Sequence, residues 1–383
     1  MSSTTDPLFT PLSVGNLTLR NRLVMSPMTR GFSPDGVPPE FAPDYYGRRA
    51  ENEIGLIVTE GIGVDHPAAL GDSTGTGWDY PDLHGDAALA GWKKVVDRVH
   101  AAGSAIFPQL WHHGGLRLEG TGRHPEAISV RPSGNWGPEP GPFQPPHYRE
   151  QITTMTRPIT ESEIADLIAG FARSAANAMK VGFDGIALHG AHGYMIDTFF
   201  WDVTNQRTDR WGGPSLRERA AFGVELVKAV RAEAGNTPIM FRFSQWKLHD
   251  YDAYLAETPQ ELEELLGPLT DAGVDIFDAS TRKFAVPAFD GSPLTLAGWA
   301  KKITGKPTMA VGGVTLATDL QSSFIDGSPA EDNLPAVRER IAGGEFDLIG
   351  IGRSLLTNPD WGTRVRLGQP LKSFKPEDNG TQV

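Results

Sequence analysis

The sequence contains no cysteine among its 383 residues. This excludes disulfides, thiolate metal sites and cysteine nucleophiles together, and it suits a reducing compartment, so we expect a cytoplasmic protein. Long apolar runs are also missing, because none approaches the roughly 18 residues that a membrane-spanning helix needs. The opening segment MSSTTDPLFT has neither a basic region nor an apolar core, so we expect no signal peptide there.

Positive charge is scarce as well. The chain has 35 Lys and Arg against 47 Asp and Glu, which gives a formal net charge of −12. Because no basic block offsets this excess, we expect neither nucleic acid nor a membrane surface as a partner. Hydrophobic residues make up 39% and charged residues 21%, an ordinary balance for a globular protein with a large core. Both a monomer and a homo-oligomer are compatible with this composition.

Short apolar segments recur along the chain and alternate with segments of helical periodicity. This alternation predicts parallel strands joined by helices, and eight such units favour a single (β/α)8 TIM barrel over an open sheet. No GxGxxG pattern follows the first strand, which counts against a dinucleotide-binding half. The predicted strands span Leu23–Met28, Ile54–Gly61, Ser104–Gly115, Phe183–Gly190, Thr237–Ser244, Val274–Thr281, Lys306–Gly313 and Phe346–Arg353.

Turn and capping signals predict the remaining elements. Gly15-Asn16 lies between two short strands and predicts a β-hairpin, which we expect to close the bottom of the barrel. The sequences at Thr160–Glu163 and Thr258–Glu261 have the pattern of capping boxes at helix starts. Helices are also predicted over Pro38–Asn52 and Pro214–Ala234.

The chain is expected to form one domain, residues 1–383. Its barrel core covers about residues 7–365, and 368–383 are expected to be a surface tail. Long loops should cover the C-terminal face of the barrel. The longest, residues 116–158, is rich in glycine and proline, and a loop of this length is usually a lid or a pocket wall.

One stretch, HGAHGYMIDTFFW from His189 to Trp201, directly follows the fourth predicted strand. His189 and His192 lie three positions apart, Tyr194 follows, and glycines flank the group. At the mouth of a barrel, the two imidazoles are donors for a carbonyl oxygen. A tyrosine, with a reference pKa of ~10, is a proton donor at neutral pH. A structural role for the two histidines, or a metal site made by them, is the alternative.

Polar residues and glycines stand at or just after the C-terminal ends of the predicted strands. In a barrel these ends converge on one face, and that face carries the active site. The residues are Thr29, Gly61, Gln109, His189, Arg242, Arg282, Gly312, Gly313, Gly352 and Arg353.

The exits of the seventh and eighth strands predict a phosphate site. Glycines at 312, 313 and 352 let backbone N–H groups approach a phosphate, and Arg353 adds a full charge. The helix expected from Ser354 adds the positive end of its dipole. A tight turn at Gly312–Gly313 is the structural alternative.

Two core-strand residues suit a heterocyclic ligand. Gln109 offers both a carbonyl and an amide, which matches the edge of a flavin or a nucleobase. Arg242 carries a charge into the core and needs a partner. That partner is either a flavin that becomes anionic on reduction or a buried carboxylate such as Glu60. Thr29 is a hydroxyl donor at the first strand exit, or else a turn cap.

Several separated motifs occur in a fixed order: NRLVMSPMTR, IVTEG, PQLWHHGG, LHGAHGYMIDTFF, TNQRTDRWGG, FRFS and IGIGRSLLTNPD. In this order they resemble the old yellow enzyme family, and the resemblance covers roughly residues 7–365. Members of that family are FMN-dependent ene-reductases and NAD(P)H:flavin oxidoreductases on a single (β/α)8 barrel. The resemblance therefore implies tightly but non-covalently bound FMN, with NAD(P)H as its reductant and no metal.

The resemblance also implies a set of cofactor contacts. Thr29 would donate near the flavin O4, and Arg242 would stabilise the reduced anionic ring beside N1 and the C2 carbonyl. The glycines at the last two strand exits would hold the phosphate with Arg353. The implied cofactor-binding residues are Pro27, Met28, Thr29, Gly61, Gln109, Arg242, Gly312, Gly313, Gly352 and Arg353.

The implied reaction is the reduction of an α,β-unsaturated carbonyl compound. FMN reduced by NAD(P)H passes a hydride to the β-carbon, His189 and His192 bind the carbonyl oxygen, and Tyr194 protonates the α-carbon. Trp111 is implied to shape the substrate pocket. The same flavin surface also suits nitro compounds, nitrate esters or quinones. A barrel that binds a phosphate ligand without redox turnover is the non-enzymatic alternative.

Three basic residues follow the fifth and sixth strands: Lys247, Arg282 and Lys283. They either contact an acidic group of the substrate or the phosphate of a nicotinamide cofactor, or they are solvated charges at the rim.

Overall fold

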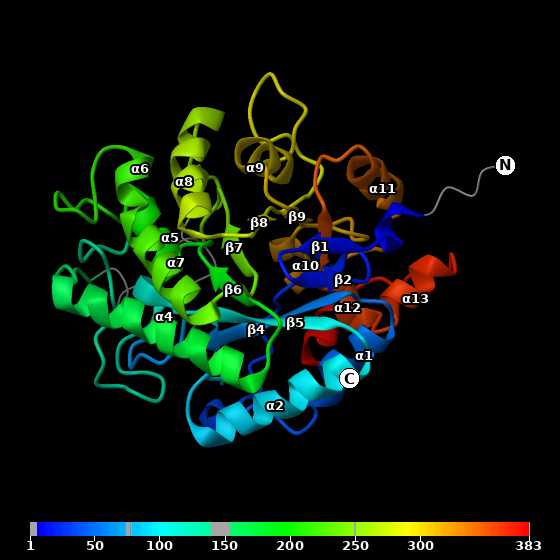
Figure 1. Cartoon of the computed structure of the whole chain (residues 1–383), viewed down its shortest axis with the longest axis horizontal. Coiled ribbons are helices and arrows are strands. Elements are labelled where there is room, and N and C mark those ends of the chain that lie inside the picture. Colours follow the sequence, from blue (N-terminus) through cyan, green and yellow to red (C-terminus); the bar gives the residue numbers. More distant parts are fainter. Residues whose placement is uncertain (1–5, 74–76, 78, 139–153, 249, 383) are drawn as a thin grey trace.

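A computed structural model describes residues 6–73, 77, 79–138, 154–248 and 250–382. Parallel strands close into a barrel in the order β10-β3-β4-β5-β6-β7-β8-β9, and helices surround it (Figure 1). This confirms the predicted (β/α)8 fold. The strands are β3 (Leu23–Met25), β4 (Leu56–Gly63), β5 (Ala105–Trp111), β6 (Ile186–His189), β7 (Ile239–Phe243), β8 (Ile276–Ser280), β9 (Thr308–Val311) and β10 (Leu348–Ile351).

The predicted hairpin is present and closes one end of the barrel. Strands β1 (Leu12–Val14) and β2 (Leu17–Leu19) pair antiparallel across a turn in which Gly15 has φ +58°. Val14 and Leu19 belong to the apolar cluster that fills the barrel interior, together with alternate strand residues such as Phe107 and Met240. The hairpin therefore seals the end opposite the strand exits.

Each of the eight barrel strands differs from its predicted bounds, and two of these differences have clear local reasons. Strand β3 ends at Met25, whereas the prediction extended it to Met28, because Pro27 has no N–H to donate to the sheet. Strand β4 continues two residues beyond Gly61, and its register against β5 shifts between Val58 and Gly61. A bulge of this kind redirects the end of a strand, here at the face where the site is expected.

The helices pack around the barrel through their apolar faces. In α2, for example, Trp92, Val95, Val96 and Val99 are buried, as the helical spacing predicts. The α-helices are α1 (Ala42–Glu51), α2 (Asp86–Ala101), α4 (Glu161–Val181), α5 (Met195–Phe200), α6 (Leu216–Arg219), α7 (Ala221–Ala234), α8 (Pro259–Ala272), α9 (Leu296–Thr304), α10 (Leu320–Asp326), α11 (Leu334–Ala342), α12 (Ser354–Thr357) and α13 (Trp361–Arg366). Short 3₁₀ turns cover Pro7–Phe9 (η1), Pro34–Gly36 (η2), Gly114–Leu116 (η3) and Pro376–Gly380 (η4).

The capping predictions had mixed outcomes. The box at Thr160 is complete, with reciprocal bonds to Glu163. At α8 the Thr258 hydroxyl accepts from the Glu261 N–H, but the Glu261 carboxylate accepts from the N–H of Glu257, so the predicted box is only half formed. The single helix predicted over Pro214–Ala234 is two helices, α6 and α7, which meet at Ala220.

The loop after β5 is organised by a buried arginine. Arg117 is fully buried, and its guanidinium donates to the carbonyls of Leu70, Thr121, His124 and Ala127. Part of the long loop that we expect to act as a lid or pocket wall, residues 139–153, lies outside the described residues.

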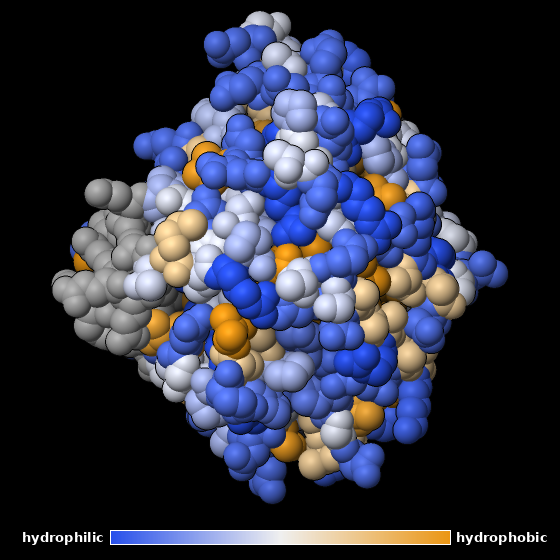
Figure 2. Space-filling view, turned by 90° about the vertical axis from the view of Figure 1, so that its left-hand side faces the viewer, coloured by the Kyte–Doolittle hydropathy of each residue, from blue (hydrophilic) through white to orange (hydrophobic). Residues whose placement is uncertain are grey.

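The C-terminal segment packs onto the barrel. Phe374 is buried, and the Arg30 guanidinium donates to the carbonyls of Asn379 and Thr381. None of the helices in the described ranges has both the length and the hydropathy of a membrane span. On the face in Figure 2, apolar residues lie scattered among hydrophilic ones.

Candidate active site

Alternate residues of the strands bring four polar side chains to the C-terminal mouth of the barrel, three of them predicted. Phe107, Ala187, Met240 and Ile276 belong to the interior cluster. Since side chains in a strand alternate between faces, the residues two positions further along also point inward. These residues are Gln109, His189, Arg242 and Asp278, and all four are buried.

The strand register places these side chains side by side. His189 is the neighbour of Arg242, and Arg242 is the neighbour of Asp278. The structure thus brings together an imidazole, a guanidinium and a carboxylate from three consecutive strands.

The residues from the HGAHGY motif form one aromatic cluster with Trp111. The rings of His189 and His192 have centroids 5.0 Å apart, and those of His189 and Tyr194 are 4.9 Å apart. Trp111 meets Tyr194 edge to face at 4.9 Å. His189 is the last residue of β6, and Tyr194 is the N-cap of α5, so the short loop between these elements positions all three motif residues.

His192 is held by residues from the loop after β7 and by the last residue of β8. Its φ of +66° is unusual for a residue with a side chain, and its N–H donates to the Ser244 hydroxyl at 3.0 Å. Its ring stacks on Trp246 at 4.2 Å, and its Nε2 lies 2.8 Å from the Ser280 hydroxyl. These contacts fix the orientation of the imidazole.

Lys247 contradicts both predicted roles. It is fully buried, and its Nζ donates to Asp197 at 2.7 Å. The other oxygen of Asp197 accepts the N–H of Gly193, at 2.7 Å. Through Asp197, Lys247 therefore supports the loop that carries His192 and Gly193. It is neither a solvated charge at the rim nor accessible to a substrate. Arg282 and Lys283 are exposed, and the Arg282 guanidinium lies 5.4 Å from the ring centre of Tyr251.

Burial keeps the site histidines neutral. Burial is the largest cause that lowers the pKa of His189 and of His192 well below its ordinary value. The charge of Arg242 acts in the same direction on both residues. A neutral imidazole has one N–H and one lone pair, so each ring is able to donate one hydrogen bond.

Two further histidines, His112 and His113, follow Trp111 in the PQLWHHGG motif, and the sequence predicted no role for them. His113 is buried against Trp111 at 4.2 Å and Tyr80 at 4.9 Å, and burial lowers its pKa to about 3. Burial also lowers the pKa of His112, whose Nε2 lies 3.2 Å from Nδ1 of His66.

Acid should destabilise the protein through these histidines, and His113 provides a direct test. Its folded pKa lies below the ordinary value of the unfolded chain, so the unfolded chain binds more protons below pH ~6.5. Stability should therefore fall as the pH decreases from about 6.5 toward 3. Between pH 7 and pH 5, His113 alone should account for a loss of about 2 kcal/mol.

Urea unfolding at pH 7 and pH 5 measures this loss. His113→Phe keeps an aromatic ring beside Trp111. It should reduce the difference in unfolding free energy between pH 7 and pH 5 by about 2 kcal/mol. An unchanged difference between the two pH values would show that His113 titrates alike in the folded and unfolded chain.

Arg242 pairs with a carboxylate that the sequence analysis did not name. Its Nε donates to Asp278 at 2.5 Å, and both side chains are buried. The carboxylate considered in its place, Glu60, accepts the N–H of Arg30 at 2.9 Å and supports the loop after β3. Burial raises the pKa of Glu60 to about 7. The position of Asp278 in β8 could have identified it as the partner of Arg242. It lies two residues after Ile276, so its side chain points to the same inward face.

Several buried donors at the mouth have no protein partner among the described residues. They are Nε2 of Gln109 and Nη2 of Arg242. Nδ1 of His189, which donates or accepts according to the tautomer, also has no hydrogen-bond partner in the described ranges. Buried polar groups in native proteins are normally hydrogen-bonded, so these atoms indicate a ligand with acceptors on its edge. The pyrimidine edge of a flavin carries carbonyl oxygens and a ring nitrogen that accept, and it fits this donor set.

The remaining residues predicted to bind the cofactor lie on, or just beyond, strands that end at the same mouth. Pro27, Met28 and Thr29 are partly buried just beyond β3. Gly61 lies under the Trp111 ring, and a Cβ at this position would come within 2.3 Å of it. Any larger residue would displace the indole.

The predicted phosphate-binding residues follow two adjacent strands. Strands β9 and β10 pair in parallel, so Gly312–Gly313 and Gly352–Arg353 leave the barrel side by side. Gly312 has φ +124°, and a Cβ there would lie 2.2 Å from the Thr281 carbonyl, so no other residue fits. The helix after Arg353 has only the four residues of α12, so its dipole contributes less than predicted.

Arg353 is oriented by the segment around α10. Its Nη1 donates to the Asp319 carbonyl at 3.0 Å and also to the Ser323 hydroxyl. Burial lowers the pKa of Arg353 to about 10, which leaves the guanidinium charged at neutral pH.

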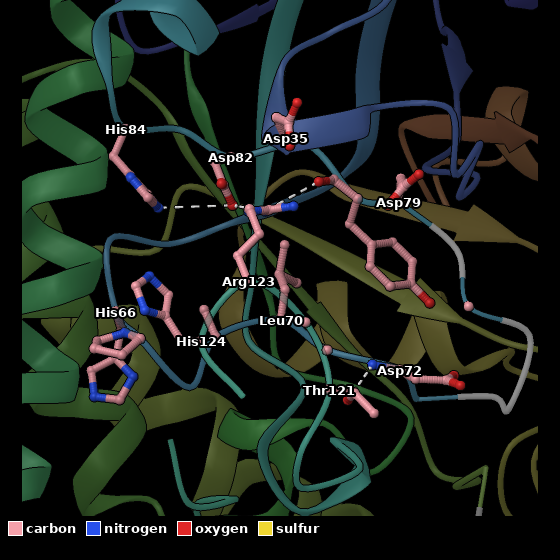
Figure 3. A pocket seen from close by; sticks show the side chains of 16 residues that line it. Asp35, His66, Leu70, Asp72, Asp79, Asp82, His84, Thr121, Arg123 and His124 are labelled. Atoms are coloured by element: carbon pink, nitrogen blue, oxygen red, sulfur yellow. Dashed lines mark hydrogen bonds and ion pairs between the residues drawn. The ribbon is translucent and has the colours of Figure 1, made fainter. Parts of the chain in front are cut away.

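A separate pocket of about 360 Å³ lies between the loop after β4 and the loop after β5 (Figure 3). Asp82 is its central charge: Arg123 pairs with it, and His84 lies 3.8 Å away. Tyr80 forms part of the wall and meets Trp111 edge to face at 5.3 Å. Neither His189 nor Tyr194 lines this pocket, so it is distinct from the candidate site.

Comparison with known proteins gives a consistent result. The model of the NADH:flavin oxidoreductase / NADH oxidase family matches residues 7–372. Chanoclavine-I aldehyde reductase of Penicillium roqueforti is 33% identical over 385 residues, which cover 98% of this chain and 92% of that protein.

Solved structures agree over nearly the whole chain. Morphinone reductase in complex with tetrahydroNAD has a TM-score of 0.79 at 26% identity, covering 98% of this chain and 94% of that one. The old yellow enzyme homologue from Zymomonas mobilis has a TM-score of 0.78 at 27% identity, covering 98% and 97%.

Proposed function

Because the chain belongs to the NADH:flavin oxidoreductase / NADH oxidase family, the old yellow enzyme family, we propose that it reduces alkenes conjugated to a carbonyl group. Membership confirms the predicted oxidoreductase class, with FMN as the cofactor and NAD(P)H as the reductant. The proposal adds the substrate class and the role of each residue.

One observation carries the proposal. The neutral imidazole of His192 and the phenol of Tyr194 lie with their ring centroids within 5.0 Å of that of His189, which is also neutral. The unpaired donors of Gln109 and Arg242 lie at the same mouth. Such a group suits a substrate that accepts hydrogen bonds at one oxygen and a proton at a nearby carbon.

The cofactor-binding residues fit FMN by their chemistry. Gln109 and Arg242 would donate to the acceptors of the pyrimidine edge, with Thr29 and Gly61 near the ring. Pro27 and Met28 would contact the ring, and the phosphate would lie at Gly312, Gly313, Gly352 and Arg353. Bound FMN would supply the hydride chemistry between NAD(P)H and the β-carbon of the alkene.

The protein residues stabilise the charge that develops on the substrate. His189 and His192 donate to the carbonyl oxygen, where negative charge builds up as the β-carbon is reduced. For His192 to donate through Nδ1, its Nε2 must accept a hydrogen bond, and the Ser280 hydroxyl at 2.8 Å is placed to donate it. Tyr194 gives its phenol proton to the α-carbon, and Trp111 forms the pocket wall beside it.

A phenol titration of the holoenzyme tests the carbonyl contact. A phenolate oxygen resembles the charged oxygen of the reaction, so a para-substituted phenol should bind and perturb the flavin absorbance. His189→Ala should weaken this binding by about 10–100-fold, since a hydrogen bond to a charged group contributes ~1.5–3 kcal/mol. Wild-type affinity in both His189→Ala and His192→Ala would reject the proposed contact.

A further inference from the structure

The carboxylate of Asp278 is the nearest charge to the Arg242 guanidinium in the barrel. The two residues are register neighbours on β7 and β8, and Arg242 Nε lies 2.5 Å from Oδ2 of Asp278. Only 7% and 1% of their side chains are exposed, so solvent screens the pair little. The charges of the two side chains therefore largely cancel each other at the barrel mouth.

Each side chain of the pair also has a buried polar atom that takes no part in the ion pair. Nη2 of Arg242 and Oδ1 of Asp278 are buried, and neither has a hydrogen-bond partner within the described ranges. The carboxylate holds the guanidinium by its Nε and leaves the Nη2 donor for another acceptor. This geometry differs from a closed bidentate pair, in which both nitrogens of the fork would be used.

Charge beside a flavin decides how readily it accepts electrons. Reduction adds negative charge to the ring, so an unopposed guanidinium favours the reduced form. A carboxylate bound to that guanidinium offsets part of this effect. Removing the carboxylate should therefore strengthen the preference for reduced FMN.

We propose that Asp278 is a positioning residue that aims Nη2 of Arg242 at the flavin and offsets its charge, thereby lowering the reduction potential of bound FMN. The proposal rests on the proposed position of Arg242 beside the cofactor. It explains why an acidic side chain points into the barrel from β8. Ile276, two residues earlier on the same face of this strand, is apolar.

The test is the midpoint potential of the flavin in the holoenzyme, measured by equilibration with a reference dye. Asp278→Asn, which keeps the shape of the side chain, should shift the potential to a more positive value. We expect about a tenfold change in the ratio of affinities for reduced and oxidised FMN, or about 30 mV for a two-electron couple. Arg242→Gln should shift the potential in the opposite direction.

A second aspartate, at the opposite end of β8, provides a matched control variant. Asp275 directly precedes β8 and pairs with Arg231, away from the mouth. Asp275→Asn should leave the potential unchanged. If Asp278→Asn folds poorly, the double variant Arg242→Gln with Asp278→Asn replaces both charges together, and its potential should lie closer to the wild-type value than that of Arg242→Gln.

The possible outcomes distinguish the role of Asp278 from the position of Arg242 beside the flavin. A shift in Arg242→Gln that is unaffected by the added Asp278→Asn, or an Asp278→Asn variant at the wild-type potential, would overturn the role of Asp278 alone. The same potential in all variants would overturn the position of Arg242 beside the flavin as well.

Discussion

Tyr194→Phe should slow the reduction of an enone by about 10²–10⁴-fold, while reduction of the enzyme by NAD(P)H stays near the wild-type rate. General acid catalysis contributes an effect of this size, and only the alkene half-reaction requires a proton at carbon. The substitution keeps the ring at the N-cap of α5 and its edge contact with Trp111 at 4.9 Å. Stopped-flow absorbance of the flavin measures the two halves separately.

Tyr80 supplies the control for this experiment. It is also a buried tyrosine that meets Trp111 edge to face, at 5.3 Å, but it lies in the wall of the separate pocket. Tyr80→Phe should leave both half-reactions near wild type. An equal loss in both halves for Tyr194→Phe, or the same loss in Tyr80→Phe, would mean that packing around Trp111 is responsible and not proton donation.

The barrel was predictable because its signals are local. Each strand is a short apolar run, and the polar residue at its exit is fixed by where that run ends, as at Gln109 in β5 and His189 in β6. Side-chain alternation then fixes which residues face inward. The strand ends were less predictable, since β3 stops early at a proline and β4 contains a bulge.

Pairing between distant elements was not predictable in the same way. The sequence predicts Lys247 to be a charge in a loop, and its burial depends on Asp197, which lies on α5. The partner of Arg242 was sought in Glu60, but the register of β7 against β8 selects Asp278. The stacking of His192 on Trp246 likewise depends on how the loop after β7 folds back over the HGAHG turn.

Lys247→Met should destabilise the protein by about 3–5 kcal/mol, because it leaves the buried Asp197 carboxylate without its cation. Both side chains of the pair are fully buried, so water cannot replace the lost partner. Urea unfolding at neutral pH measures the loss. Arg364→Met removes one partner of a more exposed pair, with Asp360, and should cost only about 0.2–1 kcal/mol.

A second substitution distinguishes the cost of an unpaired Asp197 carboxylate from the loss of the other contacts of the Lys247 ammonium. Asp197→Asn in the Lys247→Met background removes the uncompensated carboxylate, while the side-chain oxygen of the asparagine still accepts the N–H of Gly193. Most of the stability should return, since replacing both members of a buried pair costs far less than removing one. If the double variant is as unstable as Lys247→Met, the ammonium stabilises the fold through its other contacts, such as its position 6.0 Å from the ring centre of Trp201, and the ion pair with Asp197 is not the cause.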